Sequence, residues 1–275
     1  MNTKEISTII AACSPGLSNT LTGELENLGN KVLKTEPKAV IMEGTFRDVM
    51  ILNYKLRTAN RLLWKIAAFK ALHPDHLYKN ASKIQWEDLL KPDGYFSIDS
   101  FVKNRFIRDT RFANLRLKDA IADRFTRLSG SRPDSGSGKD DAVIYMRWLE
   151  DQVELFLDTS GQTIAKHGYR KLPGQAPLME NLAAAIVLES QWDKQSHFIN
   201  PMCGSGTLAI EAALMMQDIY PGKFRKAYGF QHIRSFDYKE WYALRDEIES
   251  SRKPASGGIK IIATDISRKA VSLAR

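Results

Sequence analysis

Hydrophobic residues in the first 69 positions switch repeatedly between strand-like and helix-like spacing. A strand buried on one face alternates every two residues, whereas a helix repeats its apolar positions every three or four. Gly29 is suited to end the first helix and Thr45 to cap the second. The predicted elements are strand 6–13, helix 17–28, strands 32–33 and 40–42, helix 46–56 and strand 62–69. This β-α-β-β-α-β order is typical of a ferredoxin-like domain, which we assign to residues 1–69.

Residues 70–162 carry a second set of patterns and form the second predicted domain. The clearest element is an amphipathic helix over residues 114–128, which is followed by a flexible Ser- and Gly-rich loop. The other predicted elements are helix 82–90, strand 95–102 and a hairpin of strands 142–149 and 153–159.

From residue 163 onward, strands and helices alternate, which favours a doubly wound parallel α/β sheet. The predicted elements are helix 181–190, strand 197–199, helix 208–217, helix 236–251, strand 259–264 and a helix that starts at Ser267. Two strands do not make such a sheet, because a parallel sheet needs several strands with both faces covered. We therefore expect a third domain over residues 163–275 that is truncated at Arg275, so that the chain is the first part of a longer protein.

The composition, 43% hydrophobic and 26% charged, is that of a globular protein. The net charge of +8 suits a polyanionic partner. The two cysteines, Cys13 and Cys203, are too few for a disulfide framework or a zinc site, and we expect no metal. No apolar run approaches the roughly 18 residues of a membrane span, and no signal-peptide core is present. We expect a cytoplasmic protein with no membrane partner, and the oligomeric state stays open.

A glycine-rich loop, Gly204-Ser205-Gly206-Thr207, joins a predicted strand to a predicted helix. Glycine allows tight turns and close backbone approach, and a helix N-terminus supplies free N–H groups, so this layout is typical of nucleotide cofactor sites. The loop lacks the lysine of a P-loop and the third glycine of a dinucleotide fingerprint. Asp265 closes the next strand, where a carboxylate can accept bonds from ribose hydroxyls. A plain strand-to-helix turn and a helix-capping Asp265 are the alternatives.

Four runs of residues together resemble the THUMP-containing ribosomal RNA guanine methyltransferases. They are NPMCGSGTLAIEAA at 200–213, GYR at 168–170, APLMENLAA at 176–184 and TDIS at 264–267. Residues 1–160 are similar to the ferredoxin-like plus THUMP module of that family. The resemblance implies an α/β protein in which this N-terminal module precedes a doubly wound class I methyltransferase domain.

The resemblance also implies S-adenosylmethionine as cofactor. The residues around its methionine part would be Pro201, Cys203, Gly204, Gly206 and Thr207, with Asn200 at the head of the loop and Asp265 on the ribose. Asn200 stands where the family usually has Asp, so it keeps an acceptor oxygen but loses the charge. Met179 replaces a common Lys. The family's catalytic run resembles Asn-Pro-Pro-Tyr, and because this chain contains no Pro-Pro dipeptide we assign no catalytic residue.

The basic segment, residues 101–132, holds nine basic and three acidic side chains and so carries a net charge of +6. Arginine contacts phosphates in paired geometry, and interleaved phenylalanines can stack on unpaired bases. The predicted RNA-binding residues are Lys103, Arg105, Arg108, Arg111 and Arg116. The alternative is a solvated helix face whose charges pair with one another.

These observations favour an S-adenosylmethionine-dependent methyltransferase for the exocyclic amine of a guanine in 23S ribosomal RNA. Two alternatives stay open: a transfer RNA guanine methyltransferase, because THUMP modules also serve that substrate, and a non-catalytic RNA-binding protein.

Overall fold

The computed structural model describes residues 5–170, 177–255 and 257–274. Its first part consists of β1 (Ser7–Cys13), α1 (Ser18–Asn27), β2 (Val32–Glu36), β3 (Ala39–Gly44), α2 (Phe46–Lys55) and β4 (Ala59–Lys70). The four strands pair antiparallel in the order β2-β3-β1-β4, which is the predicted ferredoxin-like arrangement. Thr45 caps α2 as expected, because its hydroxyl accepts from the Asp48 amide while the Asp48 carboxylate accepts from the Thr45 amide.

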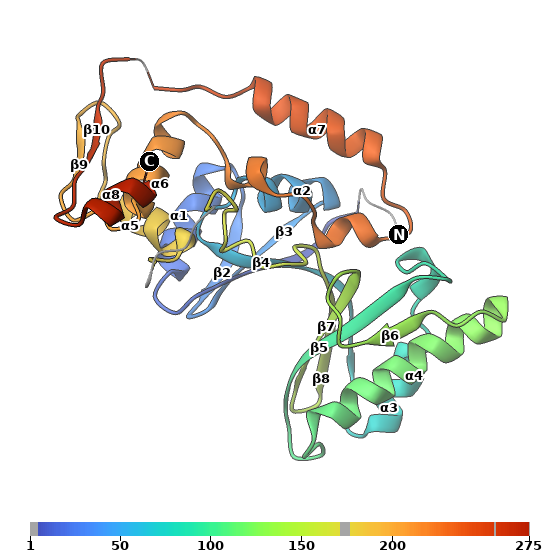
Figure 1. Cartoon of the computed structure of the whole chain (residues 1–275). Helices are drawn as coiled ribbons and strands as arrows, with labels where there is room; N and C mark the ends of the chain where they lie inside the picture. The colour runs from blue at the N-terminus through green and yellow to red at the C-terminus, as the bar shows by residue number, and fades with distance from the viewer. Residues whose placement is uncertain (1–4, 171–176, 256, 275) are drawn as a thin grey trace.

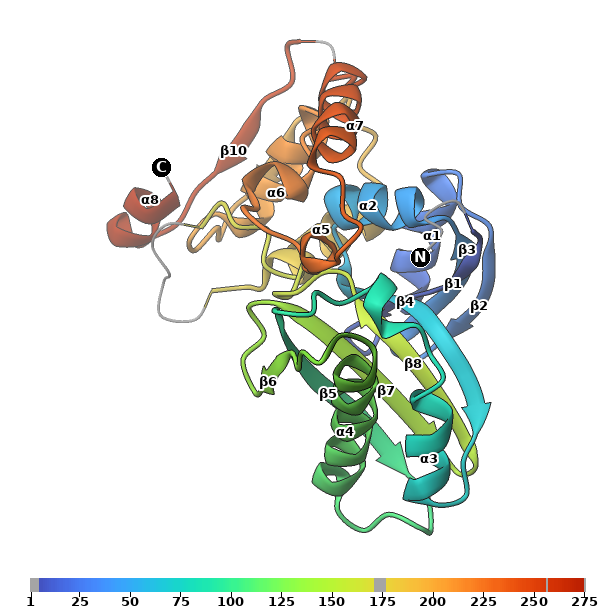
Figure 2. The same ribbon diagram turned by 90° about the vertical axis from the view of Figure 1, so that its right-hand side faces the viewer.

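The second part extends the same sheet. Its elements are α3 (Pro74–Ala81), β5 (Tyr95–Lys103), α4 (Thr110–Ser129), β6 (Asp134–Gly136), β7 (Ala142–Leu149) and β8 (Gln152–Asp158). Strand β4 pairs with β1 on one side and with β8 on the other, so the two parts share one eight-stranded sheet in the order β2-β3-β1-β4-β8-β7-β5-β6. Helices α3 and α4 lie side by side on one face of its second half (Figure 2).

The helix predicted at residues 82–90 is wrong. The structure places α3 earlier, with Pro74 at its first turn and His73 accepting the Asp75 amide as its cap. Proline is pre-organised for a first helical turn and was the start signal in this segment. Residues 82–90 hold only a short turn, Trp86–Asp88, where the buried Trp86 indole donates to the Ala81 carbonyl at 2.8 Å.

The third part alternates strands and helices, as predicted for the doubly wound class. Its elements are α5 (Glu180–Glu189), β9 (Phe198–Asn200), α6 (Thr207–Met216), α7 (Tyr238–Ser250), β10 (Ile261–Ala263) and α8 (Arg268–Ala274). Strands β9 and β10 pair in parallel, and Phe198 and Ile261 face α5 and α6. The alternate positions Ile199 on β9 and Ile262 on β10 point to the opposite face and are 62% and 39% exposed, so only one face of this sheet is covered.

The insertion, residues 217–258 between α6 and β10, docks on the first part rather than on its own sheet. In Figure 1, α7 lies over α2. Three insertion aromatics join the main core and pack edge-on or stacked against one another and against α2. They are Tyr228, Phe230 and Trp241, with Phe46 and Tyr54 as their partners on α2.

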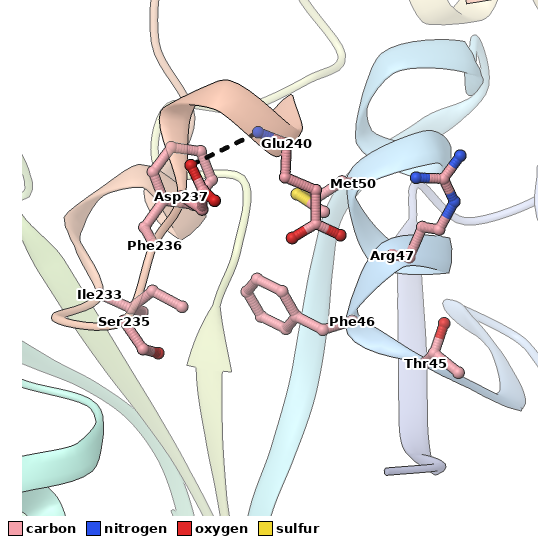
Figure 3. Close-up of a pocket in the computed structure, with 9 residues that line it drawn as sticks. All are labelled: Thr45, Phe46, Arg47, Met50, Ile233, Ser235, Phe236, Asp237 and Glu240. Atoms are coloured by element: carbon pink, nitrogen blue, oxygen red, sulfur yellow. Dashed lines mark hydrogen bonds between the residues drawn. The ribbon is translucent and has the colours of Figure 1, made fainter. Parts of the chain in front are cut away.

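A cavity of about 290 Å³ marks the seam between α2 and the insertion (Figure 3). Phe46 and Met50 of α2 line it opposite Ile233 and Phe236. Two of the polar side chains that line it are helix caps. Thr45 caps α2, and the Asp237 carboxylate caps α7 by accepting from the Lys239 and Glu240 amides. We therefore assign this cavity to packing between the two parts.

Candidate cofactor and RNA sites

The candidate cofactor site lies where β9 and β10 end side by side. The two strands are parallel, with Asn200 opposite Ala263, so the loops that follow leave from the same edge of the sheet. In open α/β sheets this carboxyl edge is where ligands bind. The structure thus brings the glycine-rich loop and the acidic turn together, although 59 residues separate Gly206 from Asp265 in the sequence.

Backbone hydrogen bonds join the two loops. The Thr264 amide donates to the Asn200 carbonyl at 3.0 Å, and the Cys203 amide donates to the Thr264 carbonyl at 2.9 Å. The Asp265 carboxylate accepts from the Gly204 amide at 2.9 Å and from the Ser267 amide at 2.8 Å. Because these bonds favour the ionised form, they hold the pKa of Asp265 below its usual value. Asp265 therefore acts as a charged link between the loops.

Both glycines of the loop have backbone conformations that L residues rarely adopt. Gly204 has φ 52° and Gly206, the N-cap of α6, has φ 78°. A Cβ on Gly206 would lie 2.8 Å from the Ala274 Cβ, so α8 packs directly against this turn. A Cβ on Gly204 would meet no atom within 4 Å, so the loop presents open backbone at that point.

The remaining predicted cofactor residues differ in exposure. Cys203 and Thr207 are buried, while Pro201 is exposed. Burial and the nearby Asp265 raise the pKa of the Cys203 thiol, which favours its protonated form. The side-chain oxygen of Asn200 is buried and has no hydrogen-bond partner among the described residues. A buried acceptor in this state fits a ligand that brings a donor, such as an ammonium group.

Arg170 is a site residue that the residue patterns did not single out. Its guanidinium donates to the Thr207 hydroxyl at 3.1 Å, to the Leu178 carbonyl at 2.7 Å and to the Glu180 carboxylate at 3.0 Å. It thereby ties the start of α5 to the start of α6. The sequence signal that could have identified Arg170 is its position in the GYR run at residues 168–170. Ala176, the first residue of the APLMENLAA run, lies outside the described residues.

A buried ionic cluster lies one helical turn beyond the loop. His167 and Glu211 are both fully buried, and the His167 Nδ1 lies 2.7 Å from the Glu211 carboxylate. The other ring nitrogen of His167 lies 2.8 Å from the Arg57 carbonyl, and the Arg57 guanidinium lies 3.9 Å from Glu211. The cluster connects α6 to the end of α2, a contact between the third and first parts that sequence spacing does not reveal.

The basic segment contains two kinds of predicted RNA-binding residue. Arg111 pairs with Asp109 at 2.8 Å, and Arg116 pairs with Asp75 at 2.8 Å. Lys103, Arg105 and Arg108 are exposed and have no acidic partner among the described residues. They lie at the end of β5 and in the loop before α4, at the end of the second part that is remote from the third part (Figure 2).

Candidate metal sites and membrane-spanning helices are both absent from the part of the chain that the structure describes. No group of three or more His, Cys, Asp or Glu side chains there could hold a metal ion. None of the helices in these ranges has the length and apolar character needed to cross a membrane.

Three family models match successive stretches of the chain. They are the RlmL ferredoxin-like domain over residues 8–63, the THUMP domain over residues 73–158 and the RMKL-like methyltransferase domain over residues 167–275. A "predicted N6-adenine-specific DNA methylase" from Listeria monocytogenes has the same fold, with a TM-score of 0.85, 30% identity and coverage of 98% of this chain and 70% of that one. The chain belongs to the THUMP-domain methyltransferase family.

Other family members extend the comparison. The ribosomal RNA large subunit methyltransferase K/L of Marinomonas sp. is 36% identical over 271 residues, which are 96% of this chain and 37% of that protein. The solved structure of SMU.472 complexed with SAH has a TM-score of 0.85 and 27% identity, and covers 98% of this chain and 71% of that one. The chain thus spans little more than a third of the length of the Marinomonas methyltransferase.

Proposed function

We propose that this protein is an S-adenosylmethionine-dependent RNA methyltransferase, and that it methylates the exocyclic amine of a guanine in 23S ribosomal RNA. The observation that carries the cofactor assignment is the loop at the carboxyl edge of β9, which combines open backbone at Gly204 with a buried Asn200 oxygen that has no hydrogen-bond partner among the described residues. The name of the Marinomonas relative supports the ribosomal RNA substrate. Such a substrate supports a cytoplasmic location.

The cofactor would be held by residues of both loops. Asn200, Pro201, Cys203, Gly204, Gly206 and Thr207 would surround its methionine part, and Asp265 would accept from its ribose. The free N–H groups at the start of α6 add positive potential that suits a carboxylate. S-adenosylmethionine supplies an activated methyl group when bound. The contribution of these residues is to bind and orient, which is the main requirement of a direct group transfer.

The second part would bind the RNA. We propose Lys103, Arg105 and Arg108 as its principal phosphate contacts, because they have no acidic partner among the residues that the structure describes. Arg111 and Arg116 would be weaker contacts, because each already pairs with an aspartate. Phosphate contacts of this kind make binding fall steeply with salt.

The test is methyl transfer from radiolabelled S-adenosylmethionine by the protein expressed from its whole reading frame. Purified 23S ribosomal RNA and bulk transfer RNA serve as separate substrates. We expect label in 23S ribosomal RNA, and nuclease digestion should place it on the guanine exocyclic amine. Label only in transfer RNA would favour the transfer RNA alternative, while label in neither would overturn the enzyme assignment.

A further inference from the structure

A groove of about 890 Å³ lies where the three parts of the molecule meet. One wall comes from Lys139 and Asp140, just before β7. Another comes from residues 160–168, which follow β8, and the third comes from residues 224–232 of the insertion. None of the residues that we assigned to cofactor or RNA from the sequence lines it.

The lining of this groove is predominantly cationic. Among the described residues that line it, the cations are Arg61, Lys139, Lys166, Arg225 and Lys226, and the one carboxylate is that of Asp140. Three of the five are already engaged. Arg61 and Lys139 pair with Asp158 and Asp99 at 2.9 and 2.7 Å, and Arg225 donates to the carbonyls of residues 160, 162 and 163.

The other two cations are available to a ligand. Lys166 and Lys226 are exposed, stand on different walls of the groove and have no acidic partner in the described ranges. Two ammonium groups without internal partners favour a ligand that carries more than one negative charge, such as the phosphates of a nucleic acid backbone.

An aromatic side chain stands beside these lysines. Phe224 lines the groove, is 37% exposed, and is held from behind by an edge contact with Tyr169 at 6.2 Å between ring centroids. A partly exposed ring among unpaired cations is the combination that binds unpaired bases by stacking while the cations hold phosphates. A double helix keeps its bases stacked internally and would leave this ring unused.

One wall of the groove adjoins a residue that contacts the cofactor loop. Gly168 is a lining residue, and Arg170, two residues later, donates to the Thr207 hydroxyl at the start of α6. Two peptide units span at most about 7.6 Å between Cα atoms. The wall that carries Lys166 and Gly168 therefore continues directly into a residue that contacts the start of α6, whereas Lys103, Arg105 and Arg108 lie at the remote end of the second part.

We propose that this groove binds the backbone of an unpaired RNA strand, with Lys166 and Lys226 on its phosphates and Phe224 against a base. The proposal rests on the proposed function, because it names the path by which the RNA substrate reaches the cofactor loop. The basic segment captures the RNA at the far end of the second part, and the groove guides the strand from there to the methyl donor.

The test compares matched lysine variants of the protein. Lys166→Gln/Lys226→Gln removes the two groove charges, and Lys31→Gln/Lys38→Gln removes two exposed charges on the far edge of the first part. Fluorescence anisotropy with labelled oligouridylate and with a 23S ribosomal RNA transcript gives Kd across a salt series. We expect only the groove variant to lose affinity, by at least about tenfold. The slope of its log affinity against log salt concentration should fall in magnitude by about 1.4, the contribution of two phosphate contacts to a single strand.

A second variant examines the aromatic contact. Phe224→Leu keeps an apolar side chain against Tyr169 but removes the ring, and we expect it to weaken oligouridylate binding about tenfold without changing the salt slope. If this variant binds oligouridylate with unchanged affinity, the proposal that the groove binds an unpaired strand is overturned. Equal affinity of the wild-type protein for duplex RNA and oligouridylate would overturn it as well. Displacement of oligouridylate by polyglutamate at equal charge concentration overturns a nucleic acid ligand in favour of an acidic protein.

The outcomes separate this inference from the proposed function. If the wild-type protein binds RNA and S-adenosylmethionine, but the groove variant retains the wild-type Kd and slope, the groove is overturned and the proposed function stands. If calorimetry detects S-adenosylmethionine binding but the wild-type protein binds no RNA, the RNA substrate itself is overturned. The groove variant should retain the wild-type affinity for S-adenosylmethionine, because neither lysine contacts the cofactor loop.

Discussion

The sheet-based region, residues 7–158, and the methyltransferase region, residues 163–170, 177–255 and 257–274, are stabilised in different ways. The first forms one eight-stranded sheet, and its large apolar side chains are buried in the main hydrophobic core. The second has a two-stranded parallel sheet and a small cluster between α5 and α6, and its insertion places its aromatics in the core of the first region. The insertion of the methyltransferase region therefore packs against the sheet-based region rather than against its own sheet.

This difference predicts that contacts between the two regions matter most where they are buried. The largest effect is expected for Glu211→Ala. Glu211 is fully buried on α6 and faces His167 and Arg57, so its removal leaves buried polar groups of both regions without their partner. Breaking a buried ionic cluster in this way costs about 3–5 kcal/mol. Urea unfolding should show that loss as a lower midpoint.

The conservative variant Glu211→Gln is the control, because it keeps the shape and one acceptor oxygen. It should cost less than Glu211→Ala. Equal midpoints for the wild type and Glu211→Ala would contradict the view that this cluster joins the two regions.

Gly222→Ala should have the next largest effect. A Cβ on Gly222 would lie 2.4 Å from the Tyr54 Cδ2 and 2.6 Å from the Tyr54 Cα, so the insertion has to move away from α2. Overpacking of this kind costs about 1–3 kcal/mol. We expect a lower free energy of unfolding and faster proteolysis within the insertion.

Gly23→Ala in α1 provides the matched control. Its Cβ would meet no atom within 4 Å, and alanine stabilises a helix interior by about 1 kcal/mol relative to glycine. If both substitutions raised the unfolding midpoint, close packing between Gly222 and α2 would be excluded.

The sequence predicted elements better than it predicted contacts. Most of the order of strands and helices, the Thr45 cap and the two glycines of the cofactor loop follow from local patterns, and the structure confirms these features. The Ser- and Gly-rich loop was wrong in part, because β6 (Asp134–Gly136) lies within it and pairs with β5. The helix predicted at residues 82–90 was wrong, because the helix of this segment begins at Pro74 and ends at Ala81.

Partners distant in sequence were beyond local reasoning. Arg116 was predicted to face RNA, yet it pairs with Asp75, which stands 41 residues earlier. Glu211 lies next to the glycine loop, but its partners come from segments 44 or more residues away. Such pairings depend on how the elements pack, and a single sequence carries no signal for them.

The substitution Asp265→Ala tests the candidate cofactor site directly. The carboxylate joins Gly204 to Ser267 and is the proposed ribose acceptor, so calorimetry should show S-adenosylmethionine affinity falling about tenfold or more. Global stability should change little, because the group is solvent-accessible. Unaltered affinity would remove Asp265 from the site.

The pH dependence of this link has a definite sign. The pKa of Asp265 lies below its ordinary value in the folded protein, so its contribution is present above the unfolded pKa of about 3.9 and is lost only as pH falls through the folded value. The part of cofactor affinity that depends on Asp265 should therefore be constant from neutral pH down to about pH 4. A loss centred well above pH 4 that disappears in Asp265→Ala would contradict this assignment.

The smallest effect is expected at the exposed pair between the two regions. Arg47 on α2 and Glu247 on α7 are 2.5 Å apart but 42% and 67% exposed. Solvent screening limits such a pair to about 0–1 kcal/mol. A double-mutant cycle of Arg47→Ala and Glu247→Ala, measured by urea unfolding at low and high salt, should give a coupling in that range that shrinks with salt. A coupling free energy as large as the effect of Glu211→Ala would contradict this view, because it would mean that burial does not separate strong from weak contacts between the two regions.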